Sequence, residues 1–222
     1  MRVMVIDTAL GLCTAAIFDV DGAATPLAVR SEAMAKGHQE RLGGLVREAA
    51  AEAGGFGEIE RIGVTVGPGS FTGLRVGMAF AQGLGAALDR PVVGLSTLDG
   101  LAASASGVDA ALIDARRGQV YARFWRDGAA DGPAAALTVD EARRRIGTLK
   151  PAPVLAGSGA ALAGAGIADA VVLDLPGPSA EALARLTAAA DPVMDRPRPL
   201  YLRAPDATPP TRLPGQARPA RP

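Results

Sequence analysis

Hydrophobic positions along the chain alternate between short β-branched runs and longer stretches with helical spacing. Runs of Val and Ile predict buried strands, whereas apolar residues three and four positions apart predict helices with one apolar face. The pattern predicts strands over residues 1–7, 13–19, 26–30, 61–66 and 92–95, and helices over 38–53, from the 67–73 turn to about 88, and 97–103. Such regular alternation is typical of an α/β protein with a central sheet.

A second and less regular series of elements begins after residues 104–107. It predicts strands over 109–114, 119–125, 153–159 and 171–175, a helix opened by a capping box at 138–141, and a last helix over 179–190. We therefore expect an N-terminal lobe over residues 1–105 and a smaller C-terminal lobe over 106–203. From residue 191 onward the chain holds nine of its 17 Pro, with six basic and three acidic residues, so we expect a disordered Pro/Arg-rich tail over 204–222.

Composition narrows the classes of function. The formal net charge is zero, which argues against a free-standing nucleic-acid binder. The lone Cys13 excludes an internal disulfide framework, and one His with one Cys argues against a structural zinc site. We see no secretory leader and no apolar run of the roughly 18 residues that a membrane helix needs. The sequence predicts a cytoplasmic protein without a membrane segment.

The most distinctive motif is the turn Gly67-Pro68-Gly69-Ser70-Phe71-Thr72-Gly73, which leads from a strand into a helix. A glycine-rich turn at a helix start exposes backbone N–H groups that can bind an anion. The segment lacks the Lys-Ser/Thr of a P-loop and the G-x-G-x-x-G pattern, and Ser70 lacks the flanking glycines of a nucleophile elbow. A tight structural turn is the favoured interpretation, with anion binding as the alternative.

The helix after this turn carries two ridges with a spacing of four residues. The small-residue ridge consists of Gly73, Gly77, Ala81 and Gly85, and the bulky ridge of Val76, Phe80, Leu84 and Leu88. Each interior Gly costs up to about 1 kcal/mol relative to Ala, so the small ridge needs a packing reason. We expect the bulky ridge to cover the sheet and the small ridge to meet a second helix. That helix is either the one carrying Leu42, Leu45 and Ala49 in the same chain, or one of another subunit.

Three further places carry residue types that can bind ligands, and two of them are candidates for a binding site. Asp7-Thr8 ends the first strand, where actin-like and sugar-kinase-like folds carry an Asp near phosphate and Mg²⁺, and the turn with Gly157 and Gly159 follows a late strand. Both are candidates for contact with a nucleotide. His38 begins a helix, but the positions where a second metal ligand would be needed hold Arg41 and Leu42, so no metal site is predicted.

Taken together, these motifs resemble the TsaB (YeaZ) family, the dimerisation subunit of the bacterial tRNA threonylcarbamoyladenosine machinery. The segments that carry the resemblance are the opening IDT hairpin, HQERL at 38–42, GVTVGPGSFTGLRVGMAFAQGLG, PVVGLSTLDGLA, LIDARRGQVY and the late YLR at 201–203. The resemblance extends from residue 3 to about 203, with a loosely matching middle over 127–175.

The resemblance implies an α/β protein with the actin-like/Hsp70-like nucleotidase (ASKHA) fold, built from two related lobes of which the second is smaller. It implies a non-catalytic partner and activator of the homologous catalytic subunit TsaD, with the ATPase TsaE as third member, reaching tRNA only through the complex. That complex transfers a threonylcarbamoyl group to N6 of adenosine 37 in tRNAs that read ANN codons. The catalytic relative carries a His-x-x-x-His metal pair where this chain has His38 and Leu42.

The resemblance also assigns the partner interface to the helices that carry Leu42, Leu45, Ala49, Gly73, Gly77, Ala81 and Gly85. No cofactor of its own is expected, with ATP or ADP and Mg²⁺ a candidate at the interface with the catalytic subunit. A homodimer of the isolated chain is left open. The rival hypotheses are a stand-alone metallopeptidase-like or actin-fold ATP-dependent enzyme, and a direct tRNA binder that uses its Arg runs and tail.

Overall fold

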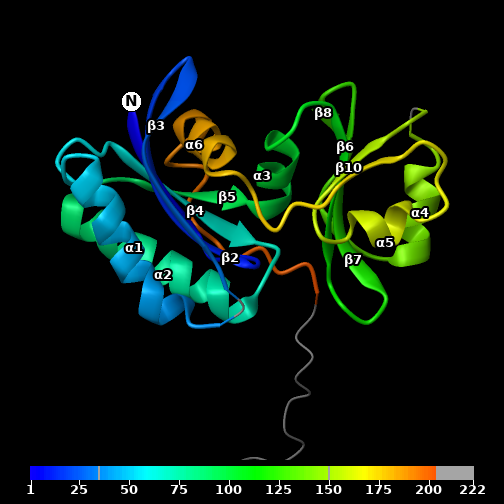
Figure 1. Cartoon of the computed structure of the whole chain (residues 1–222), viewed down its shortest axis with the longest axis horizontal. Helices are drawn as coiled ribbons and strands as arrows, with labels where there is room; N and C mark the ends of the chain where they lie inside the picture. Colours follow the sequence, from blue (N-terminus) through cyan, green and yellow to red (C-terminus); the bar gives the residue numbers. More distant parts are fainter. Residues whose placement is uncertain (35, 150, 204–222) are drawn as a thin grey trace, which may run out of the picture.

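The structure, a computed structural model, describes residues 1–34, 36–149 and 151–203. It contains two β-sheets side by side, each flanked by helices (Figure 1). The predicted tail over 204–222 lies outside the described residues. In the part of the chain that the structure describes, no helix combines the length and apolar character needed to cross a membrane.

The N-terminal sheet has five strands in the order β3-β2-β1-β4-β5. Its strands are β1 (Arg2–Asp7), β2 (Leu12–Asp21), β3 (Ala23–Ala33), β4 (Arg61–Gly67) and β5 (Val92–Ser96). The first three strands run antiparallel as a meander, while β4 and β5 lie parallel to β1. All five predicted strands of this lobe are confirmed, and β2 and β3 are longer than expected.

Helices cover both faces of this sheet. α1 (His38–Glu52) and α2 (Phe71–Leu88) lie together on one face and α6 (Ala180–Ala189) lies on the other (Figure 1). Successive side chains of a strand point to opposite faces, so Met4 and Ile6 of β1 join the core under α1 and α2, whereas Val3 and Val5 join the core under α6. Burial on both faces explains why β1 is apolar throughout.

The C-terminal sheet has the same strand topology as the first sheet. It consists of β6 (Val108–Asp114), β7 (Gln119–Arg126), β9 (Ala135–Thr138), β10 (Val154–Ala156) and β11 (Val171–Leu173). The order β9-β7-β6-β10-β11 and the strand directions are those of β3-β2-β1-β4-β5. A two-residue strand, β8 (Ala129–Ala130), extends the β7 hairpin. The expectation of two related lobes, the second smaller, is confirmed.

The helices of the C-terminal lobe are short. α4 (Val139–Ile146) begins at the predicted capping box, in which the Glu141 N–H donates to Thr138 Oγ1 over 3.2 Å and the Thr138 N–H donates to Glu141 Oε2 over 2.8 Å. α5 (Ala160–Gly164) follows β10 and has the place that α2 has in the first lobe. The sequence predicted neither α5 nor β8 and β9, and the strand expected over 153–159 is confined to 154–156.

The last helix of each half packs beyond its own sheet. α3 (Thr97–Ala103) places Leu98 and Leu101 in a core with Ala111 and Ile113 of β6, while α6 packs on the N-terminal sheet. The division into lobes at residue 105 stays a prediction. A single boundary in the sequence does not separate the two packed units, because α6 lies within 106–203 and yet buries its apolar face against β1 and β2.

The C-terminal segment, residues 191–203, ties the two halves together. Its backbone follows the N-terminal sheet, since the Gly94 N–H donates to Asp195 O over 2.7 Å and the Leu200 N–H donates to Val66 O over 2.8 Å. Arg203 then reaches the other lobe, where its guanidinium donates to the Gln119 side chain and to the carbonyl oxygen of Ala115. The described end of the chain is therefore hydrogen-bonded to both lobes.

Candidate functional site

The glycine-rich turn between β4 and α2 is fastened to the hairpin between β1 and β2. The Ser70 N–H donates to Ala9 O over 2.7 Å, and a Cβ added at Gly69 would lie 2.3 Å from the same oxygen. Gly67 has φ +115°, a conformation that favours glycine, and Ser70 Oγ accepts from the Gly73 N–H to cap α2. These contacts account for the motif as a structural turn, the interpretation that the sequence favoured.

The small-residue ridge of α2 faces the sheet. A Cβ at Gly73 would lie 2.1 Å from Thr8 O, and one at Gly77 would lie 2.3 Å from Thr8 Oγ1. A Cβ at Gly85 would lie 2.3 Å from Val92 Cγ2. The prediction that this ridge meets a second helix while the bulky ridge covers the sheet is wrong. The missing side chains let α2 sit close to the ends of β1 and β5.

The four other predicted interface residues are also buried within the chain. Leu42, Leu45, Ala49 and Ala81 belong to the core between the sheet and the helix pair, together with Met4 and Ile6. None of the seven residues is exposed in the described structure, so they support α1 and α2 from beneath. Contact with another protein would use the opposite faces of the same helices.

The outward face of this helix pair carries partly exposed apolar side chains. Val76, Phe80 and Leu84 of the bulky ridge are half-buried, and Ala79 and Gly83 beside them are exposed. A groove of about 460 Å³ runs between α1 and α2, lined by Gln39, Glu40, Gly43, Gly44, Val46, Arg47, Phe56, Phe80 and Leu84. We call the outward surface of α1 and α2, with these side chains and the groove, the α1–α2 face.

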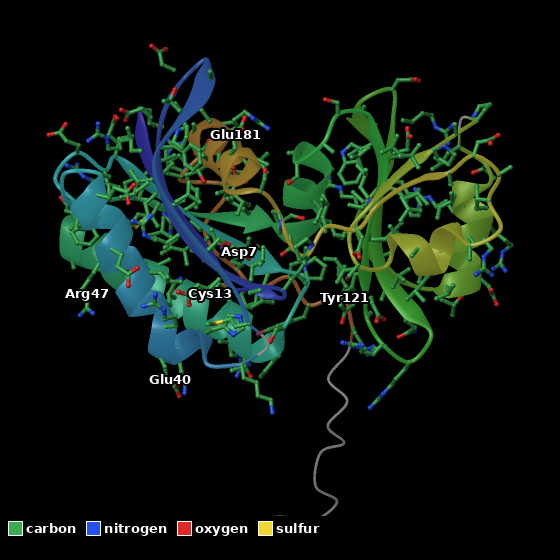
Figure 2. All side chains as sticks on the ribbon, in the orientation of Figure 1. Asp7, Cys13, Glu40, Arg47, Tyr121 and Glu181 are labelled. Atoms are coloured by element: carbon green, nitrogen blue, oxygen red, sulfur yellow. The ribbon has the colours of Figure 1, made fainter. Side chains whose placement is uncertain are left out.

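Glycine and charge shape the α1 side of this face. The ring of Phe80 packs beside Gly43, since its Cε2 would lie in van der Waals contact, 3.7 Å, with a Cβ at that position. Glu40 and Arg47 extend outward from α1 (Figure 2) and border the groove with charges of opposite sign. An apolar stripe with a polar border is typical of a protein-binding surface.

An aromatic cluster adjoins the α1–α2 face at the start of α2. The rings of Phe71 and Tyr201 lie 5.6 Å apart, and the Arg75 guanidinium carbon lies 3.7 Å from the centre of the Phe71 ring. The Arg75 Nε–H donates to the Tyr201 hydroxyl over 3.3 Å. Phe71 is 55% exposed and Tyr201 47%. Both lie in motifs noted in the sequence, GPGSFTGLR and YLR, but only the folded chain shows that they meet.

Asp7 and Thr8, the predicted nucleotide contacts of the N-terminal lobe, are fully buried. Asp7 Oδ1 accepts from Thr65 Oγ1 over 2.6 Å and from the Ala9 N–H over 2.9 Å, whereas its Oδ2 has no partner among the described residues. Burial raises the pKa of Asp7, and the two hydrogen bonds only oppose that shift. Thr8 donates to Gly73 O over 2.7 Å. Both side chains therefore fasten β1 to its neighbours.

His38 begins α1, as the sequence predicted, and is only 8% exposed. Its Nε2 has no hydrogen-bond partner among the described residues. Position 42, four residues later, holds a leucine that is part of the hydrophobic core. Within residues 1–34, 36–149 and 151–203, no three His, Cys, Asp or Glu side chains are grouped closely enough to hold a metal ion.

The cleft between the lobes is lined by the corresponding turns of the two halves. It has a volume of about 640 Å³ and is bordered by Ala9–Gly11, Gly69, Ser70, Asp114–Arg116 and Ser158, among others. Gly157 and Gly159, the predicted contacts of the second lobe, flank Ser158 but are buried, and a Cβ at Gly157 would lie 2.5 Å from Leu112 O. These glycines permit close packing of the turn on β6, and Ser158 is the residue that faces the cleft.

Comparison with known proteins identifies the family. Residues 29–193 match the family model described as TsaD, tRNA N6-adenosine threonylcarbamoyltransferase. The chain is 37% identical over 213 residues to an uncharacterized protein of Mycobacterium tuberculosis, an alignment that covers 93% of this chain and 94% of that one. It is 36% identical over 134 residues to TsaB of Escherichia coli, covering 57% of this chain and 56% of the relative.

A solved structure supports the same relationship. YeaZ from Pseudomonas aeruginosa superposes with a TM-score of 0.68 at 28% identity, covering 90% of this chain and 99% of that one. The chain belongs to the TsaB/YeaZ family. Its predicted ASKHA fold is confirmed, and so is its relation to proteins of tRNA threonylcarbamoyladenosine biosynthesis. The E. coli TsaB alignment spans only about half of that relative.

Proposed function

We propose that this chain is a non-catalytic partner and activator of the tRNA N6-adenosine threonylcarbamoyltransferase. It would form a heterodimer with the homologous catalytic subunit, TsaD, and would reach tRNA as part of that complex. The observation that carries the proposal is the α1–α2 face, whose half-buried Val76, Phe80 and Leu84 lie on a helix pair that the described residues leave uncovered. Membership in the TsaB/YeaZ family supports a role in tRNA threonylcarbamoyladenosine biosynthesis. The match of residues 29–193 to the TsaD model supports the choice of a partner with the same fold.

The geometry of the face suits helix-on-helix docking. Helices that approach closely need small residues beside large ones, and Gly43, Gly44 and Gly83 provide them around Phe80 and Leu84. A homologous subunit has the same fold and can present an equivalent helix pair, so the two would pack face to face in a nearly symmetric way. The same logic allows the isolated chain to form a homodimer through this face.

The alternative of a stand-alone enzyme receives less support from the residues. Asp7 and Thr8 are turned inward and engaged with Thr65, Ala9 and Gly73. The position that a metal-binding relative would use for its second histidine is the core residue Leu42. ATP or ADP with Mg²⁺ at the interface with the catalytic subunit, and the ATPase TsaE as third member, are retained as parts of the proposal.

Co-elution of purified proteins tests the interface. The chain is mixed with its catalytic homologue and analysed by size-exclusion chromatography with light scattering, as wild type and as Ala79→Arg. Ala79 is exposed on α2, so the substitution adds a charge to the face without entering the core. We expect it to weaken the complex at least about tenfold, because an unpaired charge would be buried at the centre of the contact.

Leu162→Arg is the matched control. Leu162 lies on α5 in the other lobe and is 46% exposed, so it receives the same arginine away from the α1–α2 face. This variant should co-elute like the wild type, and both variants should keep the wild-type circular dichroism spectrum. Normal assembly of Ala79→Arg would show that the interface lies elsewhere.

A further inference from the structure

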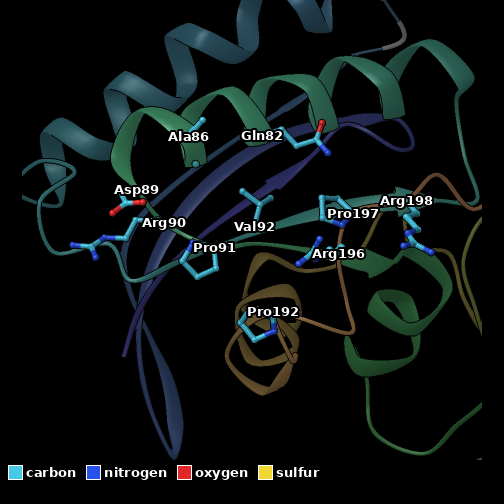
Figure 3. A pocket seen from close by; sticks show the side chains of 11 residues that line it. Gln82, Ala86, Asp89, Arg90, Pro91, Val92, Pro192, Arg196, Pro197 and Arg198 are labelled. Atoms are coloured by element: carbon cyan, nitrogen blue, oxygen red, sulfur yellow. The ribbon is translucent and has the colours of Figure 1, made fainter.

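A second concave surface lies on the other side of α2 and is separate from the α1–α2 face. It has a volume of about 670 Å³ and lies between the last turns of α2, the start of β5 and residues 192–198 of the C-terminal segment (Figure 3). Gln82 and Ala86 border it on the helix, and Arg196 and Arg198 face it from the segment. We call it the arginine groove.

The groove carries an excess of positive charge. Arg90, Arg196 and Arg198 line it, all three residues are exposed, and no ion pair within the described residues involves them. Asp89 is the one acidic residue of the described lining, and it lies beside Arg90 at one end (Figure 3). The three guanidiniums therefore keep most of their charge available for a ligand.

The acidic residues of the same segment do not neutralise these arginines. Asp195 Oδ2 accepts from the Asp191 N–H over 2.8 Å, and Asp191 Oδ1 accepts from the Val193 N–H over 2.8 Å. Each carboxylate is thus held by the backbone of its own turn. The lining of the groove accordingly includes Arg196 and Arg198 but neither of the two carboxylates.

The backbone that carries Arg196 and Arg198 is fixed in place. The Gly94 N–H donates to Asp195 O over 2.7 Å, and a Cβ at Gly94 would lie 2.9 Å from the Cα of Pro197. Gly94 thus permits the segment to lie directly on β5. A fixed backbone reduces the conformational entropy that the arginines lose when they bind a ligand.

We infer that the arginine groove binds the phosphate backbone of RNA. Guanidinium groups donate two parallel hydrogen bonds to a phosphate, so a groove lined by arginines suits the phosphates of an RNA strand. A peptide that binds by adding a strand needs backbone N–H donors, which Pro91, Pro192 and Pro197 do not provide. That the RNA is the tRNA handled by the complex rests on the proposed function. The zero net charge of the chain fits a weak contact that adds to those of a partner.

Salt dependence of RNA binding tests this assignment. Binding of a fluorescein-labelled, unmodified tRNA transcript to the full chain is followed by fluorescence anisotropy between 20 and 150 mM salt. The Arg90→Gln/Arg196→Gln/Arg198→Gln variant should bind more weakly, and the slope of log K against log salt should fall in magnitude by about 2 to 3, as the loss of three phosphate contacts requires. All three residues are exposed, so the variant should melt at the wild-type temperature.

A charge-matched control separates the groove from the overall charge. Arg126→Gln/Arg144→Gln/Arg185→Gln removes three exposed arginines outside the groove and should leave the slope unchanged. A poly-glutamate peptide serves as the second probe. Equal slopes for the groove variant and the wild type would overturn the assignment, as would poly-glutamate binding that matches tRNA in strength and in sensitivity to the variant.

The salt-dependence test of RNA binding can fail or succeed independently of the proposed heterodimer. The groove variant should still co-elute with the catalytic homologue, because the α1–α2 face is intact. If even the wild-type chain fails to co-elute, the proposed heterodimer is wrong, while the slope measured on the isolated chain still decides whether the groove binds RNA.

Discussion

The inward orientation of the small-residue ridge leads to a sharp prediction at Gly77. Glycine inside a helix normally costs stability, so Gly→Ala on an open helix surface stabilises by up to about 1 kcal/mol. At Gly77 the added methyl group would lie 2.3 Å from Thr8 Oγ1, well inside van der Waals contact. Thr8 is fully buried and its hydroxyl donates to Gly73 O over 2.7 Å, so it has little freedom to move away.

The magnitude follows from three opposing contributions. Overpacking of a buried site costs about 1 to 3 kcal/mol, and displacing the Thr8 hydroxyl from its buried acceptor costs about 1 to 3 kcal/mol more. The gain in helix propensity offsets up to about 1 kcal/mol. Gly77→Ala should therefore lower the free energy of unfolding by about 1 to 6 kcal/mol. For a chain of this size each kcal/mol lowers Tm by roughly 2 to 4 °C.

Urea denaturation followed by circular dichroism measures the effect, with Gly83→Ala as the matched control. Gly83 lies on the exposed side of the same helix and a Cβ there would meet nothing within 4 Å, so this variant should be as stable as the wild type or more stable. Adding Thr8→Ala to Gly77→Ala should restore part of the loss, because the next nearest Thr8 atom, its Cβ, lies 3.6 Å from the added methyl. Equal stabilisation by both glycine substitutions would refute the inward packing of the ridge.

Three further predictions concern two buried side chains and one arginine that connects the lobes. Burial raises the pKa of Asp7 in the folded state, so the folded protein loses stability through this group as the pH rises above the unfolded pKa of about 3.9. In urea titrations, the stability of Asp7→Asn relative to the wild type should therefore increase between pH 4 and pH 8. Burial raises the pKa of Cys13 to about 11, so iodoacetamide should alkylate the native protein at pH 8 at least about 100-fold more slowly than the urea-unfolded chain. Arg203→Ala removes the hydrogen bonds to Gln119 and to the carbonyl oxygen of Ala115, which should speed amide hydrogen exchange in residues 191–203 while α1 keeps its protection.

Local patterns predicted most of the elements because local chemistry determines them. The apolar run of β1, the helical spacing of α1 and the capping box of α4 each specify one conformation over a few neighbouring residues. α5 was missed because its five residues, AALAG, contain no cap and too few positions to show a period. The short strand β9 lacks the alternation of a longer strand for the same reason.

The surface against which a helix packs is harder to predict from the sequence, as α2 shows. The spacing of Gly73, Gly77 and Gly85 identifies a ridge but not the surface that it meets. Thr8 and Val92, which occupy that surface, come from distant parts of the chain. The α1–α2 face was predicted at the level of the two helices, whereas its outward residues required the fold. The same holds for α6, whose apolar face is evident in the sequence but whose partner sheet is not.

The buried Asp7 illustrates a limit of reasoning by position in a fold. An Asp at the end of the first strand is where nucleotide-binding relatives place a functional carboxylate, and the structure has it there. Its hydrogen bonds with Thr65 and Ala9 and its full burial assign it a structural task in this chain. Contact of Asp7 with a nucleotide stays a prediction.

Threonylcarbamoyl transfer to tRNA by the reconstituted proteins tests the central proposal most directly. The rate at which the catalytic homologue modifies an unmodified tRNA transcript is measured without this chain, with the wild type and with Ala79→Arg. The proposal predicts no transfer by this chain alone, a marked rise in the rate of the homologue when the wild-type chain is added, and no rise with Ala79→Arg although that variant is folded. A rate that is the same with and without the wild-type chain, or transfer by the chain alone, would contradict it.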